Sequence, residues 1–441
     1  MYFIYSILLA LGFLIMSPLF LLRREKYASG FKERLGHYPA FTHDERPVIW
    51  LHCVSVGETN AARPLVDAIR ENFAGHRLVI STTTQTGQEL ARTIFKEKAD
   101  AVVYFPFDFK FSVRRALKTY RPSVVLLMET EIWPRFIREA NHSGARIAIV
   151  NGRLSNRSAS RYSLIGFFIS RIFSTIDLAL MQGTGDAQRI ASLGMPVGQI
   201  NVTGNIKFDI KNTESEQAIT DILAGRFDLP GERTLIIAAS THEPEERSFL
   251  EAWCSIANGA VPVRPRLMIV PRHPERFDAI AKLVESFRSD PACEWRDYTF
   301  ARRSEDESVP DKTADVILLD SIGELRAAYP LAEIVFVGGS LIPHGGQSVL
   351  EPAAAGKAII TGPHTENFAD AIAVFRSNNA LIQLPETTAA ADEIFMTICD
   401  LLDNGELRSE LGRNAKAVMT ANSGATANTI DRLKDLLKAG G

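Results

Sequence analysis

A single carboxylate stands just after a buried strand near the start of the chain. The apolar run Val48–Leu51 predicts that strand, and small residues, a glycine and then Glu58 follow it. A carboxylate at this position has two possible roles. It is either an ordinary acid favoured by the dipole of the helix that starts there, or a general base that takes a proton from a bound hydroxyl group.

Two further groups in the first half of the chain have types suited to catalysis. Glu129 and Glu131 follow the apolar run 123–128, and two carboxylates at a strand end are costly to bury unless they bond to something. Lys207 lies just before a polar stretch, in a position to face a cleft between two domains.

The second half offers residues that suit a phosphate group. Arg272 follows the apolar run 266–270, and an Arg at a strand end can bind a phosphate with two hydrogen bonds. A glycine-rich stretch, 338–346, precedes a helix predicted to start near Ser348, and such a helix start can hold an anion. Ser348 and Glu351 also have the spacing of a capping box, which is the purely structural alternative.

The common nucleotide and metal fingerprints are missing. No G-x-G-x-x-G follows a predicted strand, Gly356-Lys357 is followed by Ala, and the sequence has no Asp-x-Asp. The four cysteines (53, 254, 293 and 399) are far apart, so no metal site is predicted and no metal or other cofactor is expected. We interpret the cysteines as reduced thiols of a cytoplasmic protein.

Apolar runs alternate with helical patterns along most of the chain. Strands are predicted at 47–54, 77–82, 101–105, 123–128 and 146–150, and a second series begins near residue 233. Continuous apolar strands separated by helices predict parallel sheets covered on both faces. We therefore expect an α/β fold with two doubly wound domains that face a central cleft, and ligands at the carboxyl ends of the strands.

Composition changes give the predicted domain boundaries. We predict a membrane anchor at 1–22, an N-terminal α/β domain at 23–210, a polar linker at 211–230 and a C-terminal α/β domain at 231–441. The last helix of the C-terminal domain is a candidate for packing back on the N-terminal domain.

The N-terminal segment predicts that the protein associates with a membrane. Residues 2–22 carry no charge and are long enough to cross a hydrocarbon core of about 30 Å. Basic residues follow at once, which places the body of the protein on the cytoplasmic face. A cleaved signal peptide is the alternative, but it lacks a basic start and a cleavage site.

A basic stretch without acids lies at 140–176. It holds Arg153, Arg157 and Arg161 and continues into an apolar segment, a pattern that suits acceptor binding at an anionic lipid surface. The alternative is a solvated basic helix with a core stripe. The net charge of the whole chain is −3, which argues against nucleic acid as a partner.

Seven of these stretches together resemble one family, the 3-deoxy-D-manno-octulosonic acid (Kdo) transferases. They occur in the family's order and spacing, and the resemblance covers nearly the whole chain. The stretches are HCVSVGE (52–58), METEIWP (128–134), NGRLSNRSASRY (151–162), TGNIKFD (203–209), VPRHPERF (270–277), GEL (323–325) and GGSLIPHGGQSVLEPAAAGK (338–357).

The resemblance implies a GT-B-like fold and a glycosyltransferase with inversion at the donor carbon. It implies transfer of Kdo from CMP-Kdo to a lipid A precursor (lipid IVA) in lipopolysaccharide core biosynthesis, at the cytoplasmic face of the inner membrane. Glu58 matches the general base, while Glu129 and Lys207 match residues that stabilise the transition state. The resemblance makes 23–210 the acceptor-binding domain and 231–441 the CMP-Kdo-binding domain. The positions that match the CMP site are Pro271, Arg272, Gly323, Glu324, Leu325, Ser348, Val349, Leu350 and Glu351.

One departure and two alternatives accompany the resemblance. The family often has Asn-Pro where this chain has Ser348-Val349. Another GT-B nucleotide-sugar enzyme, either a UDP-sugar transferase or an epimerase, is the main alternative, and a screen of donors separates the two. A non-catalytic scaffold tethered to the membrane is a third possibility, and it would not require Glu58.

Overall fold

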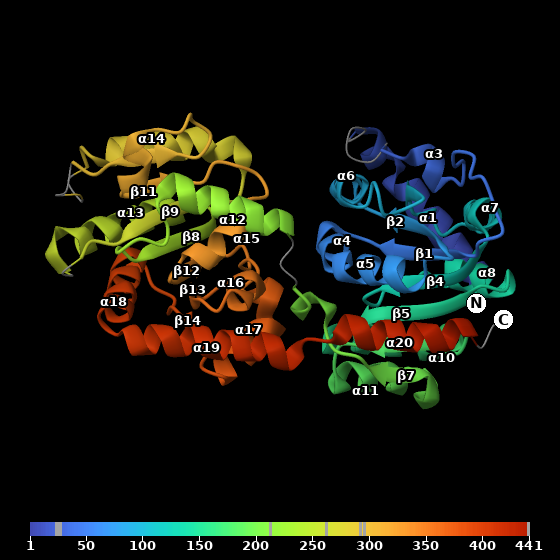
Figure 1. Ribbon diagram of the computed structural model, residues 1–441. Coiled ribbons are helices and arrows are strands. Elements are labelled where there is room, and N and C mark those ends of the chain that lie inside the picture. Colours follow the sequence, from blue (N-terminus) through green and yellow to red (C-terminus); the bar gives the residue numbers. More distant parts are fainter. Residues whose placement is uncertain (23–28, 211–213, 261–262, 291–292, 294–296, 439–441) are drawn as a thin grey trace. The chain divides into compact units, whose positions relative to one another are not determined.

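The chain folds into two compact α/β units, each built on one parallel sheet between layers of helices (Figure 1). The first unit comprises Met1–Asp209 and Asn422–Gly441, and the second comprises Ile210–Ala421. A computed structural model describes residues 1–22, 29–210, 214–260, 263–290, 293 and 297–438.

The first unit contains a seven-stranded sheet in the order β3-β2-β1-β4-β5-β6-β7, with every neighbouring pair parallel. This order has the topology of a doubly wound sheet, as the sequence predicts. The strands are β1 (Val48–Cys53), β2 (Arg77–Thr82), β3 (Ala101–Tyr104), β4 (Pro122–Met128), β5 (Arg146–Gly152), β6 (Leu178–Met181) and β7 (Ile200–Val202).

Helices cover both faces of this sheet because its strands are apolar on both sides. Trp50 of β1 packs into one core with helices α7, α8 and α10, and Leu51 packs into the other with α5, α6 and α20. The helices of this unit are α1 (Tyr2–Leu22), α3 (Phe31–Arg34), α4 (Val56–Ala61), α5 (Arg63–Asn72), α6 (Gln85–Ile94), α7 (Lys110–Tyr120), α8 (Pro134–His142), α9 (Asn156–Ser163), α10 (Gly166–Phe173), α11 (Thr184–Ser192) and α20 (Ala425–Lys438).

The chain returns to the first unit at its end through α20. Asp209 accepts hydrogen bonds from the backbone N–H groups of Gly424 (2.6 Å) and Thr426 (2.5 Å), which holds the start of α20. Ile430 and Leu433 then pack into the same core as the buried residues of α5.

Helix α1 spans the uncharged segment 2–22 and packs against other parts of the first unit. The Tyr5 hydroxyl donates to Asp108 (2.7 Å), and Phe13 makes edge contacts with Phe107 and Phe109. Several apolar side chains of the same helix are exposed, among them Phe3, Ile4, Ile7, Leu8, Leu11, Leu14 and Ile15. Within the described part of the chain, none of the helices has both the length and the apolar character needed to cross a membrane.

The second unit contains another seven-stranded parallel sheet, in the order β10-β11-β9-β8-β12-β13-β14. Its strands are β8 (Leu235–Thr241), β9 (Arg266–Pro271), β10 (Phe300–Arg302), β11 (Val316–Leu318), β12 (Ile334–Val337), β13 (Ala358–Thr361) and β14 (Ile382–Gln383). Its α-helices include α12 (Glu214–Phe227), α13 (Glu245–Ser255), α14 (Phe277–Phe287), α15 (Leu325–Ala328), α16 (Leu350–Ala354), α17 (Ala369–Ser377), α18 (Ala390–Asp403) and α19 (Gly405–Asn422). One core of this unit lies beneath α13, α14 and α18.

The predicted linker at 211–230 is largely a helix. Helix α12 buries Leu223 and Phe227 completely, and the Arg226 guanidinium forms a buried ion pair with Asp311 (2.8 Å). Two of its buried positions, Thr220 and Arg226, also carry polar groups, and both have partners inside the unit.

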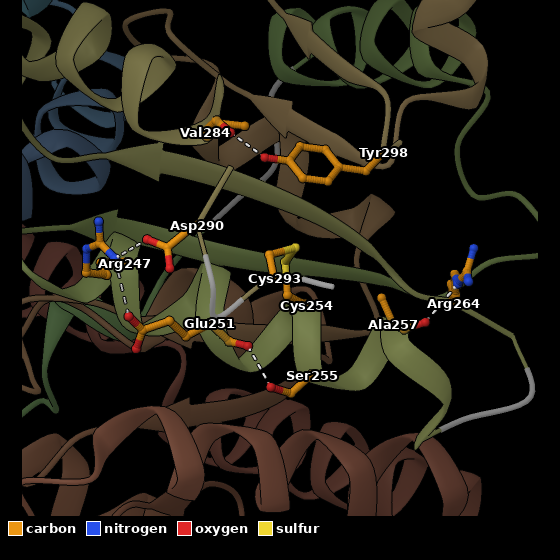
Figure 2. Close-up of a disulfide and its surroundings, with 10 residues drawn as sticks. All are labelled: Arg247, Glu251, Cys254, Ser255, Ala257, Arg264, Val284, Asp290, Cys293 and Tyr298. Atoms are coloured by element: carbon orange, nitrogen blue, oxygen red, sulfur yellow. Dashed lines mark hydrogen bonds and ion pairs between the residues drawn. A yellow bond between two sulfur atoms is a disulfide. The ribbon is translucent and has the colours of Figure 1, made fainter. Parts of the chain in front are cut away.

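The prediction of four reduced cysteines is wrong for two of them. Cys254 of α13 forms a disulfide with Cys293, with their Cα atoms 5.3 Å apart (Figure 2). The two residues are separated by 39 positions, so nothing in their spacing indicates that the fold brings them together. Cys53 and Cys399 are free thiols.

Candidate active site

Glu58 lies where β1 gives way to α4, and its side chain folds back on that turn. The backbone N–H of Val54 donates to Glu58 Oε2 (2.7 Å), and the Ser55 hydroxyl donates to Oε1 (3.3 Å). The side chain is only 7% exposed. Glu58 therefore fills part of the ordinary structural role of an acid at a helix start, because its carboxylate accepts hydrogen bonds from groups of its own turn.

The surroundings of Glu58 favour its neutral form. The pKa of Glu58 is raised to about 8, mainly by burial and also by the nearby carboxylates of Glu129 and Glu131, while the hydrogen bonds from Val54 and Ser55 oppose the rise. A carboxyl group whose pKa lies near the working pH can both hold and release a proton. This makes Glu58 a credible acid–base group as well as part of the turn.

Glu129 and Lys207 form an ion pair at the same edge of the sheet. Glu129 directly follows β4 in a left-handed backbone conformation (φ 55°), and the Lys207 ammonium donates to its Oε1 (2.9 Å). Both side chains are partly exposed, at 24% and 31%. The structure thus brings together two predicted residues that are 78 positions apart in the sequence.

Asn151 positions Lys207 and was not among the residues predicted from the sequence. This wholly buried residue of β5 also has a positive φ (53°), and its side-chain oxygen accepts from the backbone N–H of Ile206 (3.0 Å). The Asn205 side chain then accepts from the N–H of Lys207 (3.0 Å). A buried Asn inside an apolar strand was the available signal, because such a polar group requires a partner.

The position of Glu58 and Glu129 in the topology agrees with a ligand site. From β1 the chain moves outward to β2 and β3 and then returns to pair β4 with β1 on its other side. Glu58 follows β1 and Glu129 follows β4, so the two residues flank the point where the strand order reverses. Ligands of doubly wound sheets bind at this point, outside the carboxyl ends of the strands.

The three arginines predicted for acceptor binding lie on the surface next to this edge. Arg153 follows β5, and Arg157 and Arg161 are exposed residues of α9 separated by one helical turn. The exposed apolar residues Leu164, Ile165 and Phe167 follow them. The basic and apolar residues of the sequence pattern are therefore exposed together on neighbouring helices.

Arg272 follows β9 in the second unit, as the sequence predicts. Pro271 is the last residue of the strand, and the backbone N–H of Arg272 donates to Thr241 at the end of β8 (3.0 Å). The Arg272 side chain is exposed, and no ion pair joins it to a carboxylate of the described residues.

The tripeptide Gly323-Glu324-Leu325 forms the start of α15 after β11. Gly323 has a positive φ (89°), which an L-residue adopts only with strain. Glu324 accepts two hydrogen bonds from the Arg303 guanidinium (3.0 and 2.9 Å) and one from the Ser321 hydroxyl (2.6 Å). Glu324 therefore fixes the shape of this turn, and its carboxylate is already engaged.

The segment 348–351 is not the capping box that its spacing indicated. Helix α16 begins at Leu350 with Val349 as its N-cap, and the Leu350 N–H donates weakly to the Ser348 hydroxyl (3.3 Å). The helix has only five residues, so its dipole is weak. Glu351 lies half-buried in its first turn.

Residues 29–210 match the family model described as "3-Deoxy-D-manno-octulosonic-acid transferase (kdotransferase)". The chain is 35% identical over 415 residues to the 3-deoxy-D-manno-octulosonic acid transferase of Haemophilus influenzae, covering 94% of this chain and 92% of that protein. The chain belongs to the Kdo transferase family. A second relative, the enzyme of that name from Bordetella pertussis, is 33% identical, covering 88% of this chain and 87% of that one.

Solved structures extend the similarity to the fold. UDP-GlcNAc 2-epimerase from Neisseria meningitidis matches with a TM-score of 0.57 at 12% identity, covering 89% of this Kdo transferase and all of that chain. A glycosyltransferase from Rickettsia africae matches with a TM-score of 0.55 at 13% identity, covering 90% of the chain and all of that one. These matches confirm the GT-B-like architecture of the two sheets.

Proposed function

We propose that this Kdo transferase moves Kdo from CMP-Kdo to a hydroxyl group of a lipid A precursor, with Glu58 as the general base. The observation that carries the proposal is the arrangement at the first unit's strand-order reversal. There a buried carboxyl group with a raised pKa lies beside the Glu129–Lys207 ion pair.

The test is a transfer reaction with purified protein, CMP-Kdo and a tetra-acylated lipid A precursor. Mass spectrometry should detect a product heavier by one or more Kdo residues. UDP-sugars offered in place of CMP-Kdo should give no product and no epimerised sugar. A product from a UDP-sugar alone would overturn the proposal in favour of the alternative nucleotide-sugar enzyme.

The transfer step needs only a few groups to account for every bond and proton. The acceptor oxygen forms a bond to the anomeric carbon of Kdo, the bond from that carbon to the phosphate oxygen breaks, and CMP leaves with the electron pair. Glu58 takes the acceptor proton, which only its ionised form can do. Direct displacement inverts the anomeric centre, and the sugar passes through a state with oxocarbenium character, as in glycoside hydrolysis.

Glu129 and Lys207 act on the charges of this transition state. The ion pair holds both side chains in place and leaves an ionised carboxylate near the reacting sugar, where positive charge develops. On the donor side, the Arg272 guanidinium is the group suited to the negative charge that grows on the leaving phosphate.

The acceptor is a lipid, so we propose that the first unit binds the inner membrane from its cytoplasmic face. Tyr2 of α1 contacts Phe168 of α10 (ring centroids 5.2 Å apart), so the two helices are neighbours. The α1–α10 surface is the set of exposed apolar side chains on α1, on α10 and on the two residues just before α10: Phe3, Ile4, Ile7, Leu8, Leu11, Leu14, Ile15, Leu164, Ile165 and Phe167. With the arginines of α9 close in sequence, this surface suits an interfacial association with anionic lipid.

Arg272→Ala should weaken the donor side of the reaction. Removing a charge-assisted contact to phosphate should raise the inhibition constant of CMP about tenfold and slow transfer as well. The measurement is CMP inhibition of the transfer reaction, with Arg264→Ala as a control from the same unit, because Arg264 lies before β9 rather than after it. Unchanged CMP inhibition in the Arg272 variant would place the phosphate site elsewhere.

EDTA should leave the rate of transfer unchanged. The sequence has no Asp-x-Asp motif, and the described residues contain no group of three His, Cys, Asp or Glu side chains arranged to hold a metal ion. The rate should be compared before and after dialysis against the chelator, and again after adding Mg²⁺. A loss that Mg²⁺ restores would contradict the proposed charge stabilisation by Arg272.

A further inference from the structure

Three histidine rings meet at the carboxyl ends of the central strands of the second unit. His242 follows β8, His273 follows β9 and His344 lies in the loop after β12. The ring centroid of His242 lies 5.2 Å from that of His273 and 4.8 Å from that of His344. Since β8 pairs with both β9 and β12, this cluster lies where the strand order of the second sheet reverses.

A buried carboxylate fixes the two loops that carry the cluster. Glu245 has no exposed surface, and it accepts hydrogen bonds from the backbone N–H groups of His242, Gly339, Ser340 and Leu341 (2.7–2.9 Å). A Cβ atom on Gly338 would lie 2.7 Å from the carbonyl oxygen of Ser240, so the loops are also in close contact. The position of His242 relative to the β12 loop is therefore set by the fold.

The cluster contains a polar atom without a partner. His242 is only 8% exposed, and its Nε2 has no hydrogen-bond partner among the described residues. A Cβ atom on Gly339 would lie 3.4 Å from that Nε2 and 3.5 Å from Nε2 of Gln347. The glycine therefore leaves space beside two side-chain nitrogens, and buried polar atoms of this kind are normally satisfied by a ligand or water.

The charge state of the cluster indicates which group fits the space. The pKa of His242 is lowered to about 4, mainly by burial and also by His344 and His273, so the ring is neutral at pH 7. Glu246 and Arg276, which also act on this ring, are paired with each other (2.6 Å). A neutral imidazole and an amide can donate hydrogen bonds without adding charge, which suits a carboxylate that keeps the same charge throughout the reaction. The phosphate, whose negative charge grows as it leaves, is better matched by a cation such as Arg272.

We propose that His242, His344 and Gln347 bind the carboxylate group of the sugar acid in the donor, beside the site for its nucleotide phosphate. This inference rests on the proposed function, because it takes a nucleotide-linked sugar acid as the donor. The three side chains thereby distinguish a sugar acid from neutral sugars carried on nucleotides.

The test compares the whole donor with the nucleotide alone. His242→Phe keeps an aromatic ring of similar size but removes both nitrogens. The KM for CMP-Kdo should rise about 10–100-fold, the expected effect of losing a hydrogen bond to a charged group. The inhibition constant of CMP, which has no carboxylate, should stay within about twofold of wild type. His242→Gln, which restores a donor N–H, should recover part of the loss.

Controls keep the result interpretable. His43→Phe removes an exposed imidazole of the first unit and should change neither constant. If His242→Phe does not fold, as judged by its melting temperature, the double variant His344→Phe with Gln347→Leu replaces it, because neither of these side chains is fully buried.

Two results would overturn the inference. Either KM for CMP-Kdo remains unchanged, or CMP affinity falls as much as the affinity for CMP-Kdo, which would assign the cluster to the nucleotide. A wild-type protein that does not use CMP-Kdo at all is a different result, because it rejects the proposed function itself and the carboxylate site with it.

Discussion

Turnover of the Glu58→Gln variant is expected to fall by about 10²–10⁴-fold, the usual effect of losing a general base. The Gln side chain keeps the shape of Glu58 and can still accept the N–H of Val54, so the turn at the end of β1 should persist. The measurement is the initial rate of Kdo transfer at saturating donor and acceptor, together with CMP inhibition, which should remain near wild type because Glu58 lies in the first unit.

The pH dependence gives this prediction a second readout. A base with a pKa of about 8 is ionised only at higher pH, so wild-type kcat/KM should rise with pH and level off above about pH 8. The Glu58→Gln variant should lose this rise. Glu131→Gln is a comparison variant, because burial also raises the pKa of that neighbouring carboxyl group, and it should keep the rise but shift it to lower pH, since Glu131 raises the pKa of Glu58. A near-normal kcat in the Glu58→Gln variant would show that Glu58 only shapes the turn.

Stability should change in the opposite direction to activity. The folded state raises the pKa of Glu58 above its usual value, so ionising this group costs stability as the pH rises from about 4.5 to 8. The neutral Gln side chain avoids that cost. The variant should therefore melt at a higher temperature than wild type at pH 9, and at a similar temperature at pH 4.5.

Replacing Arg153, Arg157 and Arg161 together with Gln should weaken acceptor docking by about two orders of magnitude. Each Arg near an anionic surface contributes about 1 kcal/mol, and 1.4 kcal/mol corresponds to a factor of ten. The defect should appear as a raised KM for the lipid acceptor, with the KM for CMP-Kdo unaltered. Because the interaction is electrostatic, wild-type binding should also weaken with added salt, while the variant should respond less.

A matched triple variant separates docking from a general loss of charge. Lys282, Lys312 and Lys416 are exposed residues of the second unit, and replacing them with Gln removes the same formal charge. Binding to vesicles that contain anionic lipid should fall for the arginine variant only. Normal vesicle binding and normal acceptor KM in the arginine variant would mean that α9 is a solvated surface and that the lipid docks elsewhere.

The sequence predicts the central strands of both sheets well because they are long, continuous apolar runs. The predicted strand at 77–82 is β2, and the second predicted series, which begins near residue 233, starts with β8. The edge strand β3 was predicted at 101–105, but the edge strands of the second sheet were not, because β10 has three residues and β14 has two, too few to show a period. Helix α12 was missed for a different reason, since Arg226 looks like a surface residue until its buried partner Asp311 is known.

The sequence predicts which residues belong to the candidate site but not how they are arranged in space. Glu58 and Glu129 stand out because each follows an apolar strand, yet the ion pair between Glu129 and Lys207 depends on the placement of β4 and β7 in one sheet. The histidine cluster was hidden for the same reason. His242 and His344 are 102 positions apart, and only the pairing of β8 with β12 makes them neighbours.

The return of α20 to the first unit has a consequence for synthesis on the ribosome. Residues 210–421 are translated between the two parts of that unit, which takes about 10–40 s at roughly 5–20 residues per second. During this time the side of the unit that Ile430 and Leu433 later cover remains open to chaperones and to other nascent chains. The unit that is translated first is therefore completed last. A premature stop codon at 422–424 would leave the unit with Glu58 without α20, while the second unit would already be made.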